Sequence, residues 1–224
     1  MWMEAANVTE SDAMANPGLV GWQRRSPLAA ADRVATTLET GGSTGVRIVE
    51  RAAETLIQVS AWQAQSAAVR ASLAGALGFE APVSPRITQR DGLAIVWSGP
   101  GQWWVLASQD LSLGDRLASV LAGVAAVTEQ SGSRVLLRLS GPEVRRALAK
   151  VIALDLDPSV FAEGCAAMTD LAHVPVHFWR SPDAEGGPVF EIATPRSFAP
   201  SVWQALIAAA AEYGLEASPA DPTS

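Results

Sequence analysis

The stretch RVLLRLSGPEVRRALAKVI, residues 134–152, passes from a strand pattern directly into a helix pattern. In its first half, alternate apolar positions at Val135, Leu137 and Leu139 predict a strand with one apolar face. In its second half, apolar residues recur at helical spacing; they are Val144, Ala147, Leu148 and Val151. The serine and glutamate of SGPE, residues 140–143, have capping-box spacing, which predicts a helix start immediately after the strand.

Similar units lie on both sides of this stretch. The patterns before it predict strands at 46–50, 55–60, 93–99 and 102–108 and helices at 62–77 and 113–121. The patterns after it predict strands in AMTDLA, VPVHFWR and VFEIAT and a helix over 198–213. Gly78 and Gly214 each follow a helix, where glycine commonly ends one. The turn glycines and proline of 99–101 suit a hairpin.

Repeated units of adjacent strands followed by a helix predict an α+β protein with mainly antiparallel sheets and helices on one face. We expect a single two-lobed domain over residues 21–216, between flexible tails at 1–20 and 217–224. The loop-rich segment LDLDPSVFAEGC, residues 154–165, is a plausible boundary between the lobes.

Composition excludes several classes of function. The formal charge of −7 and the lack of a dense Arg and Lys cluster argue against a nucleic-acid partner. The acidic start MWMEAANVTESDAM does not fit a secretory signal, and no apolar run approaches a membrane span of ~20 residues. We therefore expect a cytoplasmic protein without a membrane partner. Its one cysteine, Cys165, excludes an intrachain disulfide.

The two histidines, His173 and His177, lie four residues apart in LAHVPVHFWR. Pro175 between them makes a helix of the HExxH kind improbable. In a strand both would lie on one face but ~13 Å apart at ~3.3 Å per residue, too far to hold one metal ion together. We therefore expect polar-face or interface histidines rather than a metal site.

Other candidate groups have simpler explanations. Cys165 could be a thiol nucleophile, but its small and apolar neighbours are typical of a buried structural cysteine. Asp155 and Asp157 could form a carboxylate pair, but acids before a proline more often cap a turn. SGPEV, residues 140–144, could bind an anion at a helix start, although the capping box explains it. No nucleotide fingerprint is present. The sequence thus predicts no catalytic, cofactor-binding or metal-binding residue.

Eight tryptophans are a high count, and Trp97, Trp103 and Trp104 lie close together. Because Trp103 and Trp104 are adjacent in a strand, they must point to opposite faces. Either both faces of the sheet are covered within the protein, or one tryptophan contacts a partner.

Four stretches, in this order, resemble the gamma subunit of heterotetrameric sarcosine oxidase. They are WSGPGQWWVLA (97–107), SGSRVLLRLSGPEVRRALAKVIALDLDPSVFAEG (131–164), TDLAHVPVHFWR (169–180) and RSFAPSVWQAL (196–206). In that family they correspond to a GP turn, an SxxR strand leading into SGP and a helix, a strand pair ending in WR, and RSFA opening the last helix. The likeness runs from about residue 26 to about 216. Gly101 and Gln102 stand where the family often has two acids.

The resemblance carries further expectations. The family resembles the folate-binding aminomethyltransferase (glycine-cleavage T-protein) and TrmE-like fold, which implies two small α+β lobes. The complex would oxidatively demethylate sarcosine to glycine, giving hydrogen peroxide and formaldehyde or, with tetrahydrofolate, methylenetetrahydrofolate. FAD, covalent FMN and NAD would belong to the alpha and beta subunits and zinc to the delta subunit, with no cofactor in this chain.

The chain would then be a non-catalytic accessory subunit that stabilises or positions the flavin-bearing subunits, with the alpha subunit as its main contact. The Trp103–Trp104 strand, and Arg196 with Phe198, are the interface candidates. The alternatives are a free-standing folate-dependent one-carbon transferase and the gamma subunit of an oxidase for another N-methyl compound.

Overall fold

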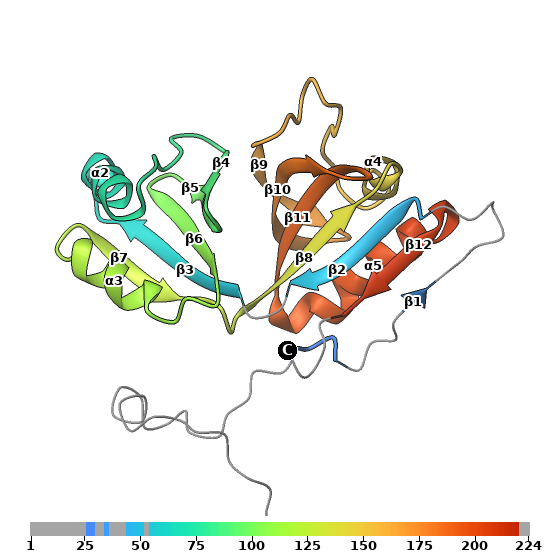
Figure 1. Ribbon diagram of the computed structural model, residues 1–224, viewed down its shortest axis with the longest axis horizontal. Coiled ribbons are helices and arrows are strands. Elements are labelled where there is room, and N and C mark those ends of the chain that lie inside the picture. Colours follow the sequence, from blue (N-terminus) through green and yellow to red (C-terminus); the bar gives the residue numbers. More distant parts are fainter. Residues whose placement is uncertain (1–25, 30–33, 36–43, 52–53, 220–224) are drawn as a thin grey trace, which may run out of the picture.

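The computed structural model describes residues 26–29, 34–35, 44–51 and 54–219, and their strands form two sheets (Figure 1). The large lobe holds the seven-stranded sheet, in the order β1-β12-β2-β8-β11-β10-β9, and the small lobe holds the five-stranded sheet β4-β5-β6-β3-β7. All of the neighbouring strands are antiparallel except β12 and β2. The predicted α+β fold with two lobes is confirmed.

The elements of the large lobe are β1 (Val34–Ala35), β2 (Val46–Arg51), β8 (Arg134–Ser140), α4 (Val144–Leu148), β9 (Ala166–Leu171), β10 (Val174–Ala184), β11 (Gly187–Pro195), α5 (Ala199–Ala210) and β12 (Leu215–Ser218). The elements of the small lobe are β3 (Glu54–Ala61), α2 (Ser66–Leu77), β4 (Ile87–Arg90), β5 (Leu93–Gly99), β6 (Gln102–Ser108), α3 (Leu113–Val120) and β7 (Ala125–Glu129). Short 3-10 turns flank α5 at Arg196–Phe198 and Ala211–Tyr213. None of the helices described is long and apolar enough to span a bilayer.

The chain changes lobe at places that the sequence did not indicate. It enters the small lobe between β2 and β3 and returns between β7 and β8, through residues 130–133. The predicted boundary at 154–165 is instead a loop between α4 and β9, within the large lobe. The reason is that β8, which precedes this loop, already pairs with β2 and β11.

Helices cover the outer face of each sheet, and the inner faces turn toward each other (Figure 1). In the large lobe, the apolar face of β8 packs with Trp203 and Leu206 of α5. In the small lobe, Val59 and Val105 pack with Leu73 of α2 and Leu117 of α3. The helices thus occupy one face of each sheet, and the other face is left for contact between the lobes.

Most predicted elements are present, with local corrections. The helix predicted from residue 62 begins at Ser66, because Ala64 adopts a φ of 62° that interrupts helical geometry. Gly78 ends this helix in the left-handed conformation, as expected. The predicted C-terminal tail is wrong at 217–218, which belong to β12 and pair in parallel with β2. The predicted tail at 1–20 lies outside the described residues.

The predicted capping box before α4 does not form. Glu143 makes no side-chain cap, and its carboxylate pairs with Arg146 at 2.8 Å. The backbone N–H of Glu143 donates instead to the carbonyl of Gly45 at 3.0 Å. This close approach needs Gly141, whose φ is 123° and whose added Cβ would lie 2.3 Å from the Gly45 oxygen.

Candidate functional site between the lobes

The inner faces of the two sheets meet in a small apolar cluster. The small lobe contributes Leu56, Ile87, Val96, Trp104 and Leu106, and the large lobe contributes Leu136, Ala166, Trp179 and Ala193. The strand register explains why these residues lie together on the inner face. Leu136 and Ala193, for example, are partners across β8 and β11, so their side chains share one face of the sheet. The lobes are therefore joined by side chains as well as by the two chain crossings.

Trp103 and Trp104 point to opposite faces of β6, as their adjacency predicts. Trp103 packs against the helices of the small lobe and donates from Nε1 to the carbonyl of Pro82 at 2.8 Å. Trp104 packs between the lobes. Both are 2% exposed. Of the two alternatives, both faces are covered within the chain, so neither indole is available as an interface anchor.

His177 lies in β10 and stacks on Trp104, with ring centroids 3.7 Å apart and the planes tilted by 35°. Arg134 lies over the same indole, with its guanidinium carbon 5.3 Å from the ring centroid. Burial, and secondarily the charge of Arg134, lowers the pKa of His177 to about 4, although a hydrogen bond with the backbone of Ser98 opposes this. The imidazole is therefore neutral near pH 7, and none of the described residues forms a hydrogen bond with its buried Nε2.

His173 does not lie in a strand, which corrects the geometry assumed from the sequence. It occupies the two-residue turn between β9 and β10, where Ala172 and His173 have φ values of 46° and 69°. His173 is exposed, whereas His177 is buried. Among the residues described, no group of three or more His, Cys, Asp or Glu side chains is placed to hold a metal ion.

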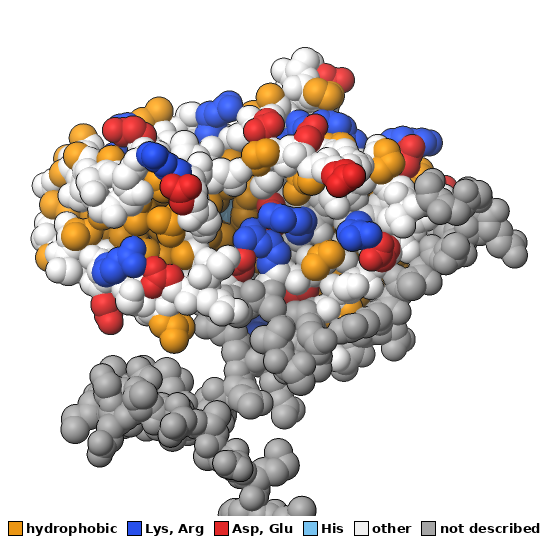
Figure 2. Space-filling view, viewed as in Figure 1, with side chains coloured by type: hydrophobic (Ala, Val, Ile, Leu, Met, Phe, Trp, Pro, Cys, Tyr) orange, Lys and Arg blue, Asp and Glu red, His pale blue; other side chains and the backbone are white. Residues whose placement is uncertain are grey.

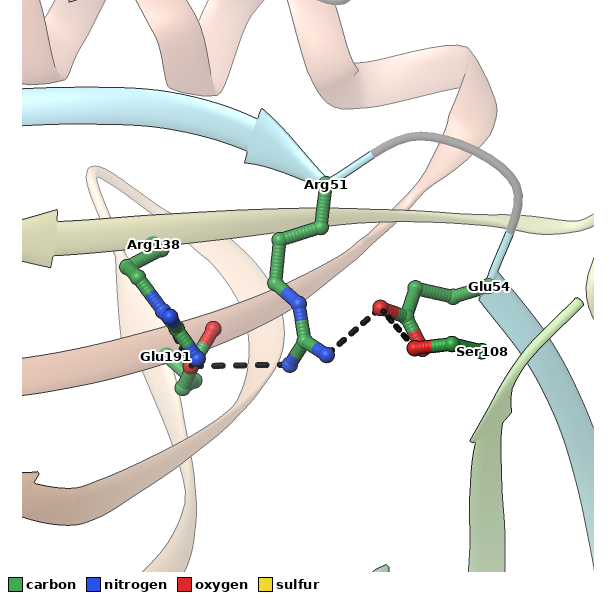
Figure 3. Close-up of polar contacts among 5 residues, drawn as sticks. All are labelled: Arg51, Glu54, Ser108, Arg138 and Glu191. Carbon is green, nitrogen blue, oxygen red and sulfur yellow. Dashed lines mark hydrogen bonds and ion pairs between the residues drawn. The ribbon is translucent and has the colours of Figure 1, made fainter. Parts of the chain in front are cut away.

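A cluster of charged side chains crosses the junction of the lobes (Figure 3). Arg138 donates to Oε1 of Glu191 from Nε at 2.8 Å and from Nη2 at 2.7 Å. Arg51, at the end of β2, lies 3.5 Å from the same oxygen and donates to Oε1 of Glu54 at 2.5 Å. Ser108 of β6 is 3.4 Å from that Glu54 oxygen. Glu54 is the first residue of β3, in the small lobe. The contact of Arg51 with Glu54 therefore connects the large lobe to the small one.

Glu191 is the most buried member of this cluster, with 1% of its surface exposed. Burial raises the pKa of its carboxyl, although the charges of Arg51 and Arg138 act in the opposite direction. Its second oxygen, Oε2, is buried and finds no hydrogen-bond partner within the described part of the chain. A carboxylate oxygen left in this state is costly, since a buried unsatisfied group costs about 1–3 kcal/mol or more.

The charged cluster borders a cleft of about 410 Å³ between the lobes. Figure 2 shows basic side chains gathered in the middle of this face, beside acidic ones. The apolar lining residues include Ile87, Leu93, Ala94, Leu106 and Trp179. The polar lining residues include Arg51, Glu54, Gln89, Arg138, Ser181 and Glu191. The cleft thus combines an apolar wall with opposite charges, as small-molecule sites commonly do.

The remaining candidates from the sequence have structural roles. Asp155 accepts from the backbone N–H of Asp157 at 2.9 Å, and Asp157 accepts from the N–H and hydroxyl of Ser159. The prediction of turn-capping acids is therefore confirmed, and the Ser159 hydroxyl lowers the pKa of Asp157. Cys165 is half-buried, with Sγ 3.7 Å from Nη1 of Arg86.

The sequence patterns did not predict the charged cluster, although two features of the sequence indicate it. Arg138 stands between Leu137 and Leu139, and therefore on the opposite face of the strand from these apolar residues. Glu191 is a charge within the otherwise apolar strand VFEIAT, and a charged residue in such a place is rarely buried without a partner.

Comparison with known proteins gives consistent likenesses. The model of the sarcosine oxidase, gamma subunit family matches residues 61–212. The sarcosine oxidase subunit gamma of Arthrobacter sp. is 33% identical over 161 residues, covering 70% of this chain and 77% of the relative. That of Corynebacterium sp. strain P-1 is 30% identical over 197 residues, covering 86% and 93%.

Solved structures agree. A chain of heterotetrameric sarcosine oxidase from Corynebacterium sp. U-96, in complex with pyrrole 2-carboxylate, superposes with a TM-score of 0.74 at 29% identity, covering 85% of this chain and 96% of that one. Aminomethyltransferase T of the glycine cleavage system from Bartonella henselae has a TM-score of 0.56 at 20% identity, covering 78% and 48%. The second likeness shows a shared fold, and the predicted resemblance is confirmed.

Proposed function

Since the chain belongs to the sarcosine oxidase gamma subunit family, we propose that it is the gamma subunit of a heterotetrameric sarcosine oxidase. The observation that carries this proposal is the likeness to a chain of the Corynebacterium sp. U-96 enzyme, of which 96% is covered. The chain acts as an accessory subunit that stabilises or positions the flavin-bearing subunits and performs no chemical step itself.

Support for the accessory role comes from how the reactive side chains are used. Arg51, Arg138 and Glu191 are engaged with one another across the lobes. His177, the buried histidine, is stacked on Trp104 and holds little charge near pH 7, because its pKa is about 4. These groups therefore connect the two lobes at their junction, beside the apolar cluster that also joins them.

The complex that we propose is cytoplasmic and converts sarcosine to glycine, with hydrogen peroxide and either formaldehyde or methylenetetrahydrofolate as further products. FAD, FMN and NAD belong to the alpha and beta subunits, zinc belongs to the delta subunit, and tetrahydrofolate is bound by a subunit other than this chain. The alpha subunit is the main contact of this chain. These assignments rest on family membership.

Of the predicted interface candidates, Arg196 is half-buried and Phe198 is exposed. Phe198 is 50% exposed at the start of α5, beside Arg196. Trp103 and Trp104, the other candidates, are buried within the chain. We expect Phe198 to contact the alpha subunit, because a large aromatic side chain at a surface is a common interface anchor.

Co-purification tests the proposal. A tagged copy of this chain, expressed in its native background, should retain two larger chains together with the visible absorbance of bound flavin. Phe198→Ser should reduce the retained flavin by roughly tenfold. Leu111→Ser is the matched control, since Leu111 is 89% exposed but lies in the small lobe, before α3.

Two results would oppose the proposal in different ways. Purification of the chain without larger partners, together with tight tetrahydrofolate binding, would favour the free-standing one-carbon transferase. If Phe198→Ser retains as much flavin as the control Leu111→Ser, Phe198 does not lie in the interface. That result would leave the subunit role itself unaffected. Turnover of another N-methyl compound, but not sarcosine, would change only the substrate.

A further inference from the structure

The cleft between the lobes carries an inference that goes beyond the subunit role. Its deepest charged group, Glu191, uses only one oxygen, Oε1, which receives the N–H groups of Arg138 and the longer contact from Arg51. The other oxygen is buried and has no hydrogen-bond partner among the residues that the structure describes, and the side chain lines the cleft. An N–H donor supplied by a ligand would satisfy it.

Charge balance restricts the ligand. Arg51 and Arg138 are matched by Glu54 and Glu191, so the cluster is neutral when all four side chains are ionised (Figure 3). A simple anion or a simple cation would leave an unbalanced charge beside the apolar wall, which is unfavourable. A zwitterion adds no net charge and offers both a cationic N–H donor and a carboxylate.

Arg51 is the side chain that can make room for such a ligand. Its contact with Glu191 is 3.5 Å long, whereas its hydrogen bond to Glu54 is 2.5 Å. Arg51 is also 26% exposed, so it can turn away from Glu191 without losing Glu54. Such a movement would open the Glu191 carboxylate to the cleft and would keep Arg51, which also lines the cleft, beside it.

We propose that the cleft binds a free α-amino acid, with the ligand's ammonium on Glu191 and its carboxylate on Arg51 and Arg138. The volume of about 410 Å³ lies within the range of about 300–1,000 Å³ that small-ligand pockets occupy. Trp179, Leu106 and Ile87 form the adjoining wall, which suits a small or apolar side chain. The site lies between the lobes, so an occupant holds them together.

Matched small probes test the chemistry directly. Isothermal titration calorimetry on the full chain should detect glycine and alanine with a Kd on the order of 1 mM. Acetate carries only the carboxylate and methylammonium only the cation, so each should bind at least roughly tenfold more weakly. Trimethylglycine keeps both charges but has no N–H, and it should also bind weakly because Glu191 requires a donor.

Two variants act on different parts of the site. Glu191→Gln keeps the shape but removes the negative charge, and it should weaken glycine binding by roughly tenfold or more. Ala94→Phe leaves all four charges and fills the cleft from β5. Glu216→Gln is the control, because Glu216 pairs with Arg47 at 2.8 Å, and neither residue is among those lining the cleft.

The outcomes separate clearly. Loss of glycine binding in Glu191→Gln and Ala94→Phe, with binding kept in Glu216→Gln, supports the site. Acetate binding as tightly as glycine, unchanged glycine binding in Ala94→Phe, or no binding up to on the order of 10 mM would overturn it. None of these results alters co-purification with larger flavin-bearing chains, so failure here is distinguishable from failure of the proposed subunit role.

Discussion

Replacing His177 with glutamine is expected to make the stability of the chain less sensitive to acid. In the folded chain, the imidazole is 8% exposed and stacked on Trp104, and burial together with Arg134 lowers its pKa to about 4. In the unfolded chain the same group titrates near its ordinary pKa of 6.5. Acid therefore protonates the unfolded state first and pulls the equilibrium toward unfolding.

The magnitude follows from the two pKa values. Well above pH 6.5 the imidazole is neutral in both states, so His177 contributes no pH dependence to the stability there. As the pH falls from about 6.5 to about 4, the unfolded state binds more protons, and stability declines at up to ~1.4 kcal/mol per pH unit. The total loss is about 3 kcal/mol, a large share of the stability of an ordinary domain.

Urea unfolding followed by far-UV circular dichroism at several pH values provides the measurement. The difference in unfolding free energy between wild type and His177→Gln cancels titrations that both proteins share, including that of Glu191. This difference should shift by about 3 kcal/mol against wild type between about pH 7 and about pH 4. His173→Asn, in the exposed turn, should retain the wild-type acid loss. A difference that stays constant across this range would refute the reasoning.

Two further predictions concern packing. Trp104→Ala and Trp103→Ala should each lower the free energy of unfolding by about 3–5 kcal/mol, since both indoles are buried on opposite faces of β6. Hydrogen exchange separates them, because only Trp104→Ala should speed exchange in the large-lobe strand β10; equal protection there would contradict the assigned faces. Gly141→Ala should cost more than ~2 kcal/mol, as its Cβ would meet the Gly45 carbonyl at 2.3 Å. At Gly123 the φ is 79° and an added Cβ would meet no neighbour. Gly123→Ala should therefore lower the free energy of unfolding by only about 1 kcal/mol, from backbone strain alone. Thermal unfolding of both variants measures the difference.

The parts of the fold that were predictable depend on local patterns. The alternation around Leu137 assigned the faces of β8 correctly, because a period of two is imposed by the strand itself. The turn at Gly78 ended α2 as expected. In contrast, β12 was missed because it is four residues long and depends on β2, which lies far back in the chain. The edge strand β4 was missed because ITQR has little apolar character.

The site was harder to predict because its members come from separate strands. Arg51 and Glu54 are three residues apart at the ends of β2 and β3, but Arg138 and Glu191 lie on β8 and β11, so no single spacing in the sequence joins all four. Strand register brings Arg138 opposite Glu191, and the chain crossing brings Arg51 beside Glu54. For His177, the sequence indicated a polar-face or interface residue, whereas the structure places it at an interface inside the chain, between the lobes.

The order in which the chain visits its two sheets also determines how it can fold as it leaves the ribosome. All strands of the small lobe lie within residues 54–129, so that lobe can form as soon as this segment has been synthesised. The strand β2 precedes it, yet its partners are β8 and β12, and Val46 pairs with Leu215 near the far end of the chain. A nascent chain must therefore carry β2 unpaired, with its backbone groups open to unwanted partners, while the small lobe folds behind it.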